Sequence, residues 1–162
     1  MDEIFDVVDE DDKVVGKATR KEVHDKKLIH RAVYFFILDK KGRIFVTQRT
    51  KNKEFFKEYW SIALGGHLKT GETYDEAVVR EVKEEANIDE KPFYMGSFKL
   101  RIPEESENVR VYVFVTDKKP ELDTFEVKQG MFLTREEMEE KIKEEKFLPE
   151  TKDLLKILKE FK

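Results

Sequence analysis

The sequence predicts a single α+β domain in which helices flank a mixed β-sheet. Strand-like runs fill the first part of the chain, one amphipathic helix follows them, and further strands and two helices complete it. At 162 residues the chain is long enough for one substantial core, and no repeat or low-complexity linker divides it. We therefore expect residues 1–162 to form one domain.

The expected sheet is built from short apolar segments separated by turn residues. The predicted strands are residues 5–8, 14–17, 32–38, 44–49, 93–102, 109–116 and 130–133. An acidic turn joins the first two and Lys41-Gly42 joins the next two, so each pair is expected to form a hairpin. The first hairpin belongs to an N-terminal extension, residues 1–30. A loop at residues 103–108 separates the later pair.

A polar, aromatic segment and the short run 61–64 lead into a loop and helix that together span residues 65–88. Thr73 and Glu76 have the spacing of a capping box, which predicts where this helix begins. Its apolar residues recur at helical spacing and predict a buried face, made of Val78, Val82 and Ala86.

Two more helices are expected in residues 134–162. Thr134 and Glu137 form a second capping box, which predicts a helix to about residue 145. From Thr151 onward, leucines recur at helical spacing and indicate packing contacts without chemistry.

The composition excludes several classes of site. The chain has no cysteine, so disulfides, zinc–thiolate sites and thiol nucleophiles are ruled out. A formal net charge of -4 with 42% charged residues gives no general reason to bind nucleic acid or acidic membranes. No segment resembles a signal peptide or a membrane span, so we expect a cytoplasmic protein. The oligomeric state is left open, and a homodimer is one of the arrangements allowed.

Three carboxylates on the internal helix predict a metal site. Successive helical residues turn by about 100°, so Glu81, Glu84 and Glu85 project from one face. Like charges this close repel one another, and a divalent cation would relieve that repulsion. Hard oxygen ligands suit Mg²⁺ or Mn²⁺. The alternative is an ordinary charged surface helix.

This stretch resembles the signature of the Nudix hydrolases. The matching residues are Gly66, Glu72, Arg80, Glu81, Val82, Glu84, Glu85 and Ile88. Only a late glycine is replaced, by Asn87, which tolerates the left-handed conformation that often follows a helix end. The resemblance implies a Nudix fold, an α/β/α sandwich, and hydrolysis of a diphosphate linkage in a nucleoside diphosphate joined to another moiety.

The resemblance also implies roles for individual residues. Glu81, Glu84, Glu85 and the carbonyl of Gly65 would bind the metal, while Glu72 and Arg80 would orient the ligand carboxylates. A general base must reach the attacking water. Glu81 and Glu126 are both candidates, and the sequence does not choose between them.

Most of the chain is also similar to isopentenyl-diphosphate isomerases and related hydrolases. Gly65 and Val109 stand where the isomerases have their acid–base cysteine and glutamate, so the resemblance favours hydrolysis. An isomerase-like protein with other acid–base groups and a non-catalytic nucleotide-binding module remain alternatives.

The three histidines of the chain fall near metal-binding histidines of the isomerases. His24, His30 and His67, with Glu107, could therefore form a second metal site. The alternative is that they are hydrogen-bonded loop residues.

Several basic and aromatic residues are candidates for binding the small-molecule diphosphate. Arg49 and Lys53 align with residues that hold diphosphate in the isomerases, although both could be ordinary surface charges. Weaker candidates are Arg101 and Arg110. Trp60 and the Phe55-Phe56 pair could stack on a base, but such residues are more often core anchors.

Overall fold

The computed structural model describes residues 3–161; residues 1, 2 and 162 of the predicted domain lie outside the described part. The elements are, in chain order, β1 (Ile4–Val8), β2 (Val14–Thr19), α1 (Arg20–Asp25), β3 (His30–Leu38), β4 (Ile44–Arg49), β5 (Trp60–Ser61), β6 (Leu64–His67), α2 (Tyr74–Ala86), β7 (Phe93–Arg101), β8 (Ser106–Val115), β9 (Val127–Leu133), α3 (Arg135–Glu144) and α4 (Thr151–Lys159).

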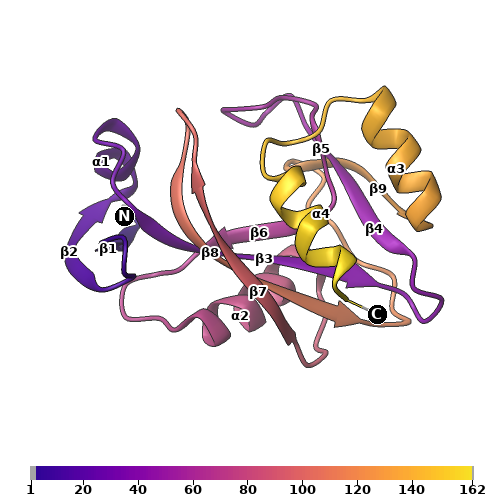
Figure 1. Cartoon of the computed structure of the whole chain (residues 1–162), viewed down its shortest axis with the longest axis horizontal. Coiled ribbons are helices and arrows are strands. Elements are labelled where there is room, and N and C mark those ends of the chain that lie inside the picture. The colour runs from indigo at the N-terminus through magenta and orange to yellow at the C-terminus, as the bar shows by residue number, and fades with distance from the viewer. Residues whose placement is uncertain (1–2, 162) are drawn as a thin grey trace.

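The long strand β3 organises the sheet (Figure 1). On one side it pairs in parallel with β8 along its whole length, and β7 pairs antiparallel with β8. On the other side it pairs antiparallel with β6. The end of β3 contacts β4, which also pairs with β5 and β9. The hairpin of β1 and β2 joins the start of β3 through Val7 and His30. The sheet is therefore mixed, as predicted.

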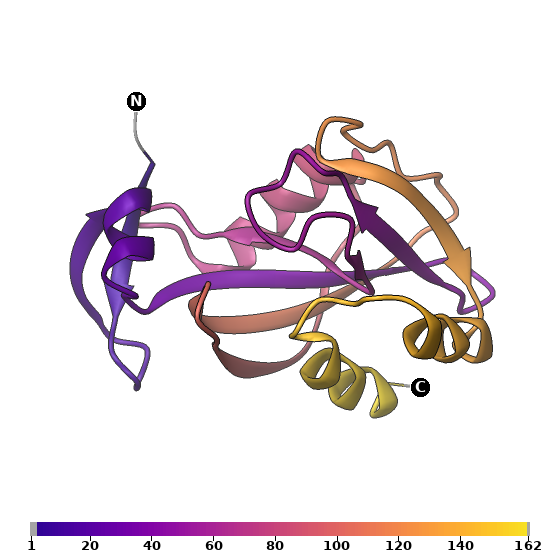
Figure 2. The same ribbon diagram turned by 90° about the horizontal axis from the view of Figure 1, so that it is seen from above.

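Alternation along β3 divides the core between two faces. Ala32 and Phe36 pack with Leu154 of α4 and Met138 of α3 on one face. Residues of the opposite face pack with the apolar stripe of α2; they are Val33, Phe35 and Ile37. Figure 2 shows α2 on one side of β3 and β8, with α4 on the other. This three-layer arrangement confirms the predicted α/β/α sandwich.

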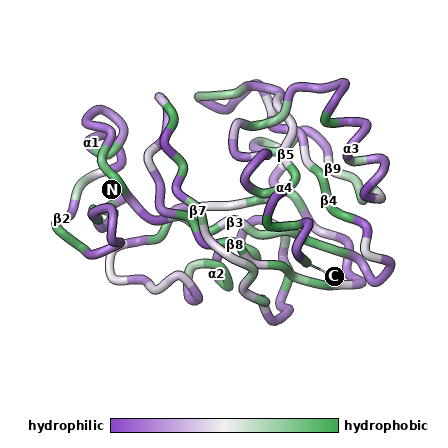
Figure 3. Tube along the Cα trace, viewed as in Figure 1, coloured by the Kyte–Doolittle hydropathy of each residue, from purple (hydrophilic) through white to green (hydrophobic). Residues whose placement is uncertain are grey.

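The hydropathy of the chain follows these layers. In Figure 3 apolar residues concentrate along the strands of the sheet, whereas α3 is mostly hydrophilic. Within the described residues, no helix is long and apolar enough to cross a membrane.

Helix boundaries agree closely with the capping signals. Thr73 and Thr134 each accept a hydrogen bond from the backbone of the glutamate three residues later, and both glutamates bond back. Asn87 ends α2 with φ 54° and ψ 45°, which is the left-handed conformation expected there.

Three local predictions were wrong or incomplete. Helix α1 was not predicted, although Thr19 and Glu22 form the same capping box. Gly65 and Gly66 lie in strand β6 instead of a loop, because β3 supplies an antiparallel partner. Strand β8 begins at Ser106, within the predicted loop 103–108, because it is paired on both sides.

Candidate functional site

The three carboxylates of α2, which we call the helix-end carboxylates (Glu81, Glu84 and Glu85), meet the glycine pair of β6. Glu81 is buried between the helix and the sheet. A Cβ atom at Gly66 would overlap the Glu81 carboxyl group. Glycine at this position is therefore what allows the carboxylate to lie against β6.

Arg80 holds this group in place. Its Nε and Nη2 donate to the two oxygens of Glu72 at 2.7 and 2.8 Å. Its Nη1 donates to Glu81 at 2.8 Å and to Glu84 at 3.2 Å, and Nη2 also reaches the His67 carbonyl at 3.1 Å. One guanidinium thus ties the loop glutamate, two helix carboxylates and β6 together, as the orienting role predicted for Arg80 and Glu72 would require.

Glu85 is the carboxylate without a partner. Within the described residues its side chain makes no hydrogen bond or ion pair, although it is half-buried. Burial, together with the charge of Glu81, raises the pKa of Glu85 to about 7. Burial also raises the pKa of Glu81, against the lowering effect of Arg80. A partly buried, unpaired carboxylate beside two others is an arrangement that a divalent cation would stabilise.

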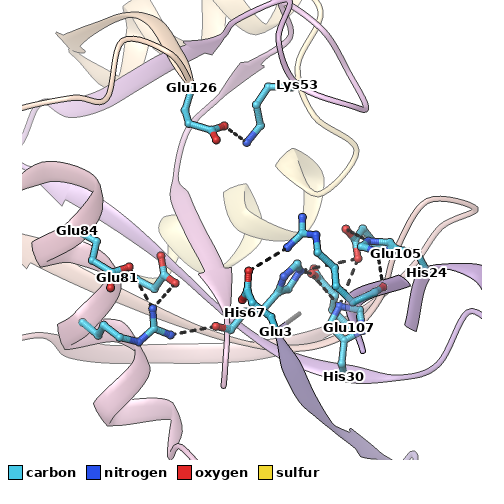
Figure 4. Close-up of polar contacts among 12 residues, drawn as sticks. Glu3, His24, His30, Lys53, His67, Glu81, Glu84, Glu105, Glu107 and Glu126 are labelled. Atoms are coloured by element: carbon cyan, nitrogen blue, oxygen red, sulfur yellow. Dashed lines mark hydrogen bonds and ion pairs between the residues drawn. The ribbon is translucent and has the colours of Figure 1, made fainter. Parts of the chain in front are cut away.

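A cavity of about 680 Å³ lies against these carboxylates. Figure 4 shows Glu81 and Glu84 at one side of it, with Lys53 and Glu126 facing them from across the cavity. Lys53 Nζ donates to the Glu126 carboxylate. This volume falls within the usual range of small-molecule sites.

A second group of ionisable side chains, the histidine–glutamate cluster (His30, His67, Glu105 and Glu107), lies at the same cavity, which all but His30 line. Its possible ligand atoms all lie within 4.8 Å of one another. Glu107 contacts His67 Nε2 at 2.8 Å, and its other oxygen accepts a hydrogen bond from the Tyr34 hydroxyl at 3.0 Å. His30 Nε2 lies 3.4 Å from Glu105 and 3.6 Å from Glu107.

The protonation of this cluster follows from its geometry. His30 Nδ1 lies 3.1 Å from the Leu28 carbonyl and so carries a proton. Burial lowers the pKa of His30, but Glu105 and Glu107 outweigh it and raise that pKa to about 9. The two histidines hold the pKa of buried Glu107 well below its usual range, despite the opposing effect of burial.

Two atoms of the cluster point to a common ligand. His30 Nε2 and Glu105 Oε2 are both buried without a hydrogen-bond partner among the described residues. They face each other at 3.4 Å, so a proton or a metal ion between the ligand atoms would satisfy both. Two imidazoles and two carboxylates form a donor set that suits a first-row divalent metal.

The structure differs from the predicted second site in one ligand. His24 bonds the Arg20 carbonyl and Glu105, and lies outside the group of four. Glu105 takes its place, although the sequence analysis did not single it out. Its position two residues before Glu107 was the available signal.

The predicted substrate-binding residues fall into two sets. Arg49 and Lys53 line the cavity, as does Glu126. Arg101 does not, because its guanidinium bonds the Glu107 carbonyl and Asn108 at 2.7 and 2.9 Å and so braces β8.

The remaining basic and aromatic candidates also lie outside the cavity lining. Arg110 stacks on the ring of Tyr74 of α2, 4.2 Å from its centroid. Trp60 is 4% exposed and stacks on Phe147, so it is a core anchor. Phe55 and Phe56 lie on the loop between β4 and β5.

A family comparison agrees with this geometry. The model of the NUDIX domain matches residues 28–155, which include both the helix-end carboxylates and the histidine–glutamate cluster. The chain belongs to the Nudix family. Of the glutamates in the sequence signature, Glu81, Glu84 and Glu85 line the cavity.

Individual relatives support the same assignment. An uncharacterized Nudix hydrolase of Nostoc sp. is 30% identical over 166 aligned positions, covering 98% of this chain and 95% of that protein. An isopentenyl-diphosphate Delta-isomerase of Serratia proteamaculans is 32% identical over 126 positions, covering 75% and 70%. The crystal structure of DR0079 from Deinococcus radiodurans has a TM-score of 0.82 at 26% identity, covering 99% of this chain and 100% of that one. The fold is thus a complete Nudix fold.

Proposed function

We propose that this Nudix protein hydrolyses the P–O–P linkage of a nucleoside diphosphate joined to another moiety, by attack of water on phosphorus. One observation carries the proposal. The helix-end carboxylates all line one cavity, where Glu81 lies against Gly66 of β6 and Glu85 has no partner among the described residues. Such a site attracts a divalent cation and is open to a small molecule.

Glu84 and Glu85 would be the principal ligands of Mg²⁺ or Mn²⁺, joined by Glu81 and by the carbonyl of Gly65, which lines the cavity beside them. When bound, such a cation lowers the pKa of a ligated water and offsets the charge that develops on phosphoryl oxygens. Arg80 keeps the carboxylates oriented through its bonds to Glu81 and Glu84.

Two glutamates compete for the role of general base. Glu81 is fixed by Arg80 at 2.8 Å, so its position is well defined. Glu126 lies across the cavity, is paired with Lys53, and is close enough to Glu85 for their charges to interact. Either carboxylate could accept a proton from the water, and replacing each in turn by glutamine would separate them.

Arg49 and Lys53 would meet the diphosphate, because both cations line the same cavity. The histidine–glutamate cluster would hold a second divalent metal. The facing, unpartnered His30 Nε2 and Glu105 Oε2 support this role, since a metal ion would satisfy both atoms.

The test is a screen of nucleotide sugars, dinucleotides and nucleoside triphosphates with Mg²⁺ or Mn²⁺, detecting released phosphate or pyrophosphate. A double variant, Glu84→Gln with Glu85→Gln, is expected to abolish metal-dependent release while remaining folded. The matched control is Glu139→Gln with Glu140→Gln, which changes the same charge on the exposed face of α3 and should leave turnover intact. Full turnover by a well-folded Glu84–Glu85 double variant would refute the assignment.

An isomerase function is the second candidate, and the histidine–glutamate cluster is the feature that favours it. Against it, Gly65 and Val109 carry no acid–base group where the isomerases have theirs. Incubation with isopentenyl diphosphate in deuterated water decides the question, because isomerisation incorporates deuterium into the product and hydrolysis does not.

A further inference from the structure

Tyr34 of β3 lines the cavity but belongs to neither metal-binding group. Its hydroxyl group donates to Oε1 of Glu107 at 3.0 Å. Glu107 is buried, with 2% of the residue exposed, and its other oxygen, Oε2, contacts two imidazoles (Figure 4): His67 Nε2 lies 2.8 Å away and His30 Nε2 lies 3.6 Å away. The tyrosine thus contacts one oxygen of this carboxylate, and the histidines contact the other.

The ring of Tyr34 is held by the two strands beside it. Phe98 of β7 packs edge-on against the ring, with the centroids 6.1 Å apart and the planes at 88°. A Cβ atom at Gly65 of β6 would lie 2.8 Å from Cδ1 of Tyr34, closer than such atoms approach in proteins. Glycine at position 65 therefore leaves room for the ring, and the hydroxyl group reaches Glu107 from a fixed direction.

The hydrogen bond from Tyr34 restricts how the Glu107 carboxylate can turn. The last torsion of a glutamate side chain is broad, so a carboxylate without partners rotates easily. With Oε1 bonded to Tyr34, Oε2 is directed toward the cluster, whose possible ligand atoms lie within 4.8 Å of one another. His30 is oriented in a similar way, because its Nδ1 contacts the Leu28 carbonyl at 3.1 Å. Hydrogen bonds of this kind commonly orient the ligands of protein metal sites.

We propose that Tyr34 is a positioning residue of the second metal site. Its hydroxyl group holds the Glu107 carboxylate so that Oε2 is presented to a divalent metal together with the other three members of the histidine–glutamate cluster. The proposal rests on the metal-binding role proposed above for this cluster, and it adds a residue that acts through Glu107 instead of binding the metal. A tyrosine suits this task because its O–H group donates one hydrogen bond from a rigid ring.

A hydrogen bond that only stabilises the fold is the competing explanation, and Tyr112 provides the matched comparison. Its hydroxyl group also donates to a carboxylate, that of Asp75 at 2.6 Å. Tyr112 does not line the cavity, and Asp75 is not a member of the cluster. Tyr34→Phe and Tyr112→Phe therefore each remove one bond between a tyrosine and a carboxylate, but only Tyr34→Phe removes it from a proposed metal ligand.

The experiment titrates each protein with Co²⁺, a first-row divalent metal that imidazole and carboxylate groups bind, and follows the visible absorption of the bound ion. Every protein, including the parent, carries Glu84→Gln and Glu85→Gln, so that the helix-end carboxylates do not compete for the ion. A variant with His30→Ala and His67→Ala in the same background identifies the signal of the cluster. Urea unfolding in EDTA checks that each variant is folded.

The parent is expected to bind Co²⁺ with an absorption signal that the double histidine variant lacks. Tyr34→Phe should bind the ion about 10- to 100-fold more weakly, and Tyr112→Phe as tightly as the parent. The positioning role is overturned by equal affinity in Tyr34→Phe and the parent, by an equal loss in Tyr112→Phe, or by a parent whose Co²⁺ binding is absent or independent of both histidines. A Co²⁺ site that depends on Tyr34, in a protein that releases no phosphate from any diphosphate, would support this role while contradicting the hydrolase function.

Discussion

Two acid-rich groups border one cavity, and they differ in how their charges are satisfied. Among the described residues, Arg80 bonds Glu81 and Glu84, and Glu85 has no hydrogen-bond or ion-pair partner. In the histidine–glutamate cluster, by contrast, Glu107 contacts His67 at 2.8 Å and Tyr34 at 3.0 Å. The first group carries repulsion that a metal can relieve. In the second, His30 offsets part of the carboxylate charge, although its Nε2 and Glu105 Oε2 lack a hydrogen-bond partner among the described residues.

This difference implies that the two groups affect the stability of the metal-free protein in different ways. Glu81, Glu84 and Glu85 lie close together and Arg80 bonds only the first two, so the remaining repulsion lowers the stability of the metal-free protein. Such a cost is tolerated at functional sites. Buried Glu107 of β8 instead contacts His30 and Tyr34 of β3 and His67 of β6, and so links these three strands. In metal-free protein we expect the histidine–glutamate cluster to stabilise the fold and the helix-end carboxylates not to do so.

The largest expected effect is the loss of stability when Glu107 of the histidine–glutamate cluster is replaced. Glu107→Gln removes the carboxylate charge beside buried His30, whose pKa is raised to about 9, and breaking a buried ion pair costs about 3 kcal/mol or more. Urea unfolding in EDTA measures this loss. Glu84→Gln, on the helix-end group, is the matched control and should change stability by less than about 0.5 kcal/mol, because its side chain is half-exposed. Equal losses for the two variants would remove the distinction.

A smaller effect concerns the approach of α2 to β6. Gly66→Ala places a Cβ where the Glu81 carboxyl group lies, so the carboxylate must move. A displacement of about 1 Å at a reacting site can reduce the rate about 100-fold, and we expect a fall in kcat/KM of that order. Gly16→Ala is the control, because a Cβ at Gly16 has nothing within 4 Å. Unchanged kinetics in folded Gly66→Ala would mean that the position of Glu81 is not critical.

The smallest effect is a pH dependence of Glu150, a buried residue of the cavity wall whose pKa is raised by burial and then by the charge of Glu107. Its folded pKa of about 7 lies above its ordinary value of 4.5, so the folded protein holds this proton more tightly than the unfolded chain does. The resulting stability is full below pH 4.5 and is lost as pH rises through 7. Glu150→Gln should therefore raise the free energy of unfolding at pH 8 by on the order of 1 to 2 kcal/mol, with little change at pH 4. Urea unfolding at the two pH values measures this, and a variant that is no more stable at pH 8 would contradict it.

The sequence predicts the parts of this molecule that depend on neighbouring residues. Capping boxes at Thr73 and Thr134 locate α2 and α3, and the spacing of Glu81, Glu84 and Glu85 predicts one acidic face. Asn87 adopts the left-handed conformation expected of it. These features need no knowledge of the rest of the chain.

The parts that were missed depend on contacts between distant residues. Ser106, Glu107 and Asn108 look like a polar loop, yet β7 pairs with all three and β3 pairs with Glu107 and Asn108, which makes them a strand. That pairing brings Glu107 to His67, 40 residues away in the sequence. Glu105 belongs to this cluster and Glu150 lies near it. Both positions depend on the tertiary fold, and no local sequence pattern predicts them.

The central claim is that the helix-end carboxylates bind a divalent cation at the cavity. The most direct measurement is anomalous diffraction from crystals soaked in Mn²⁺, compared with identically treated crystals of the Glu84→Gln, Glu85→Gln variant. The account predicts an anomalous peak among Glu81, Glu84, Glu85 and the Gly65 carbonyl that disappears in the variant. No peak at this position in the wild type, or a peak that persists unchanged in the variant, would contradict it.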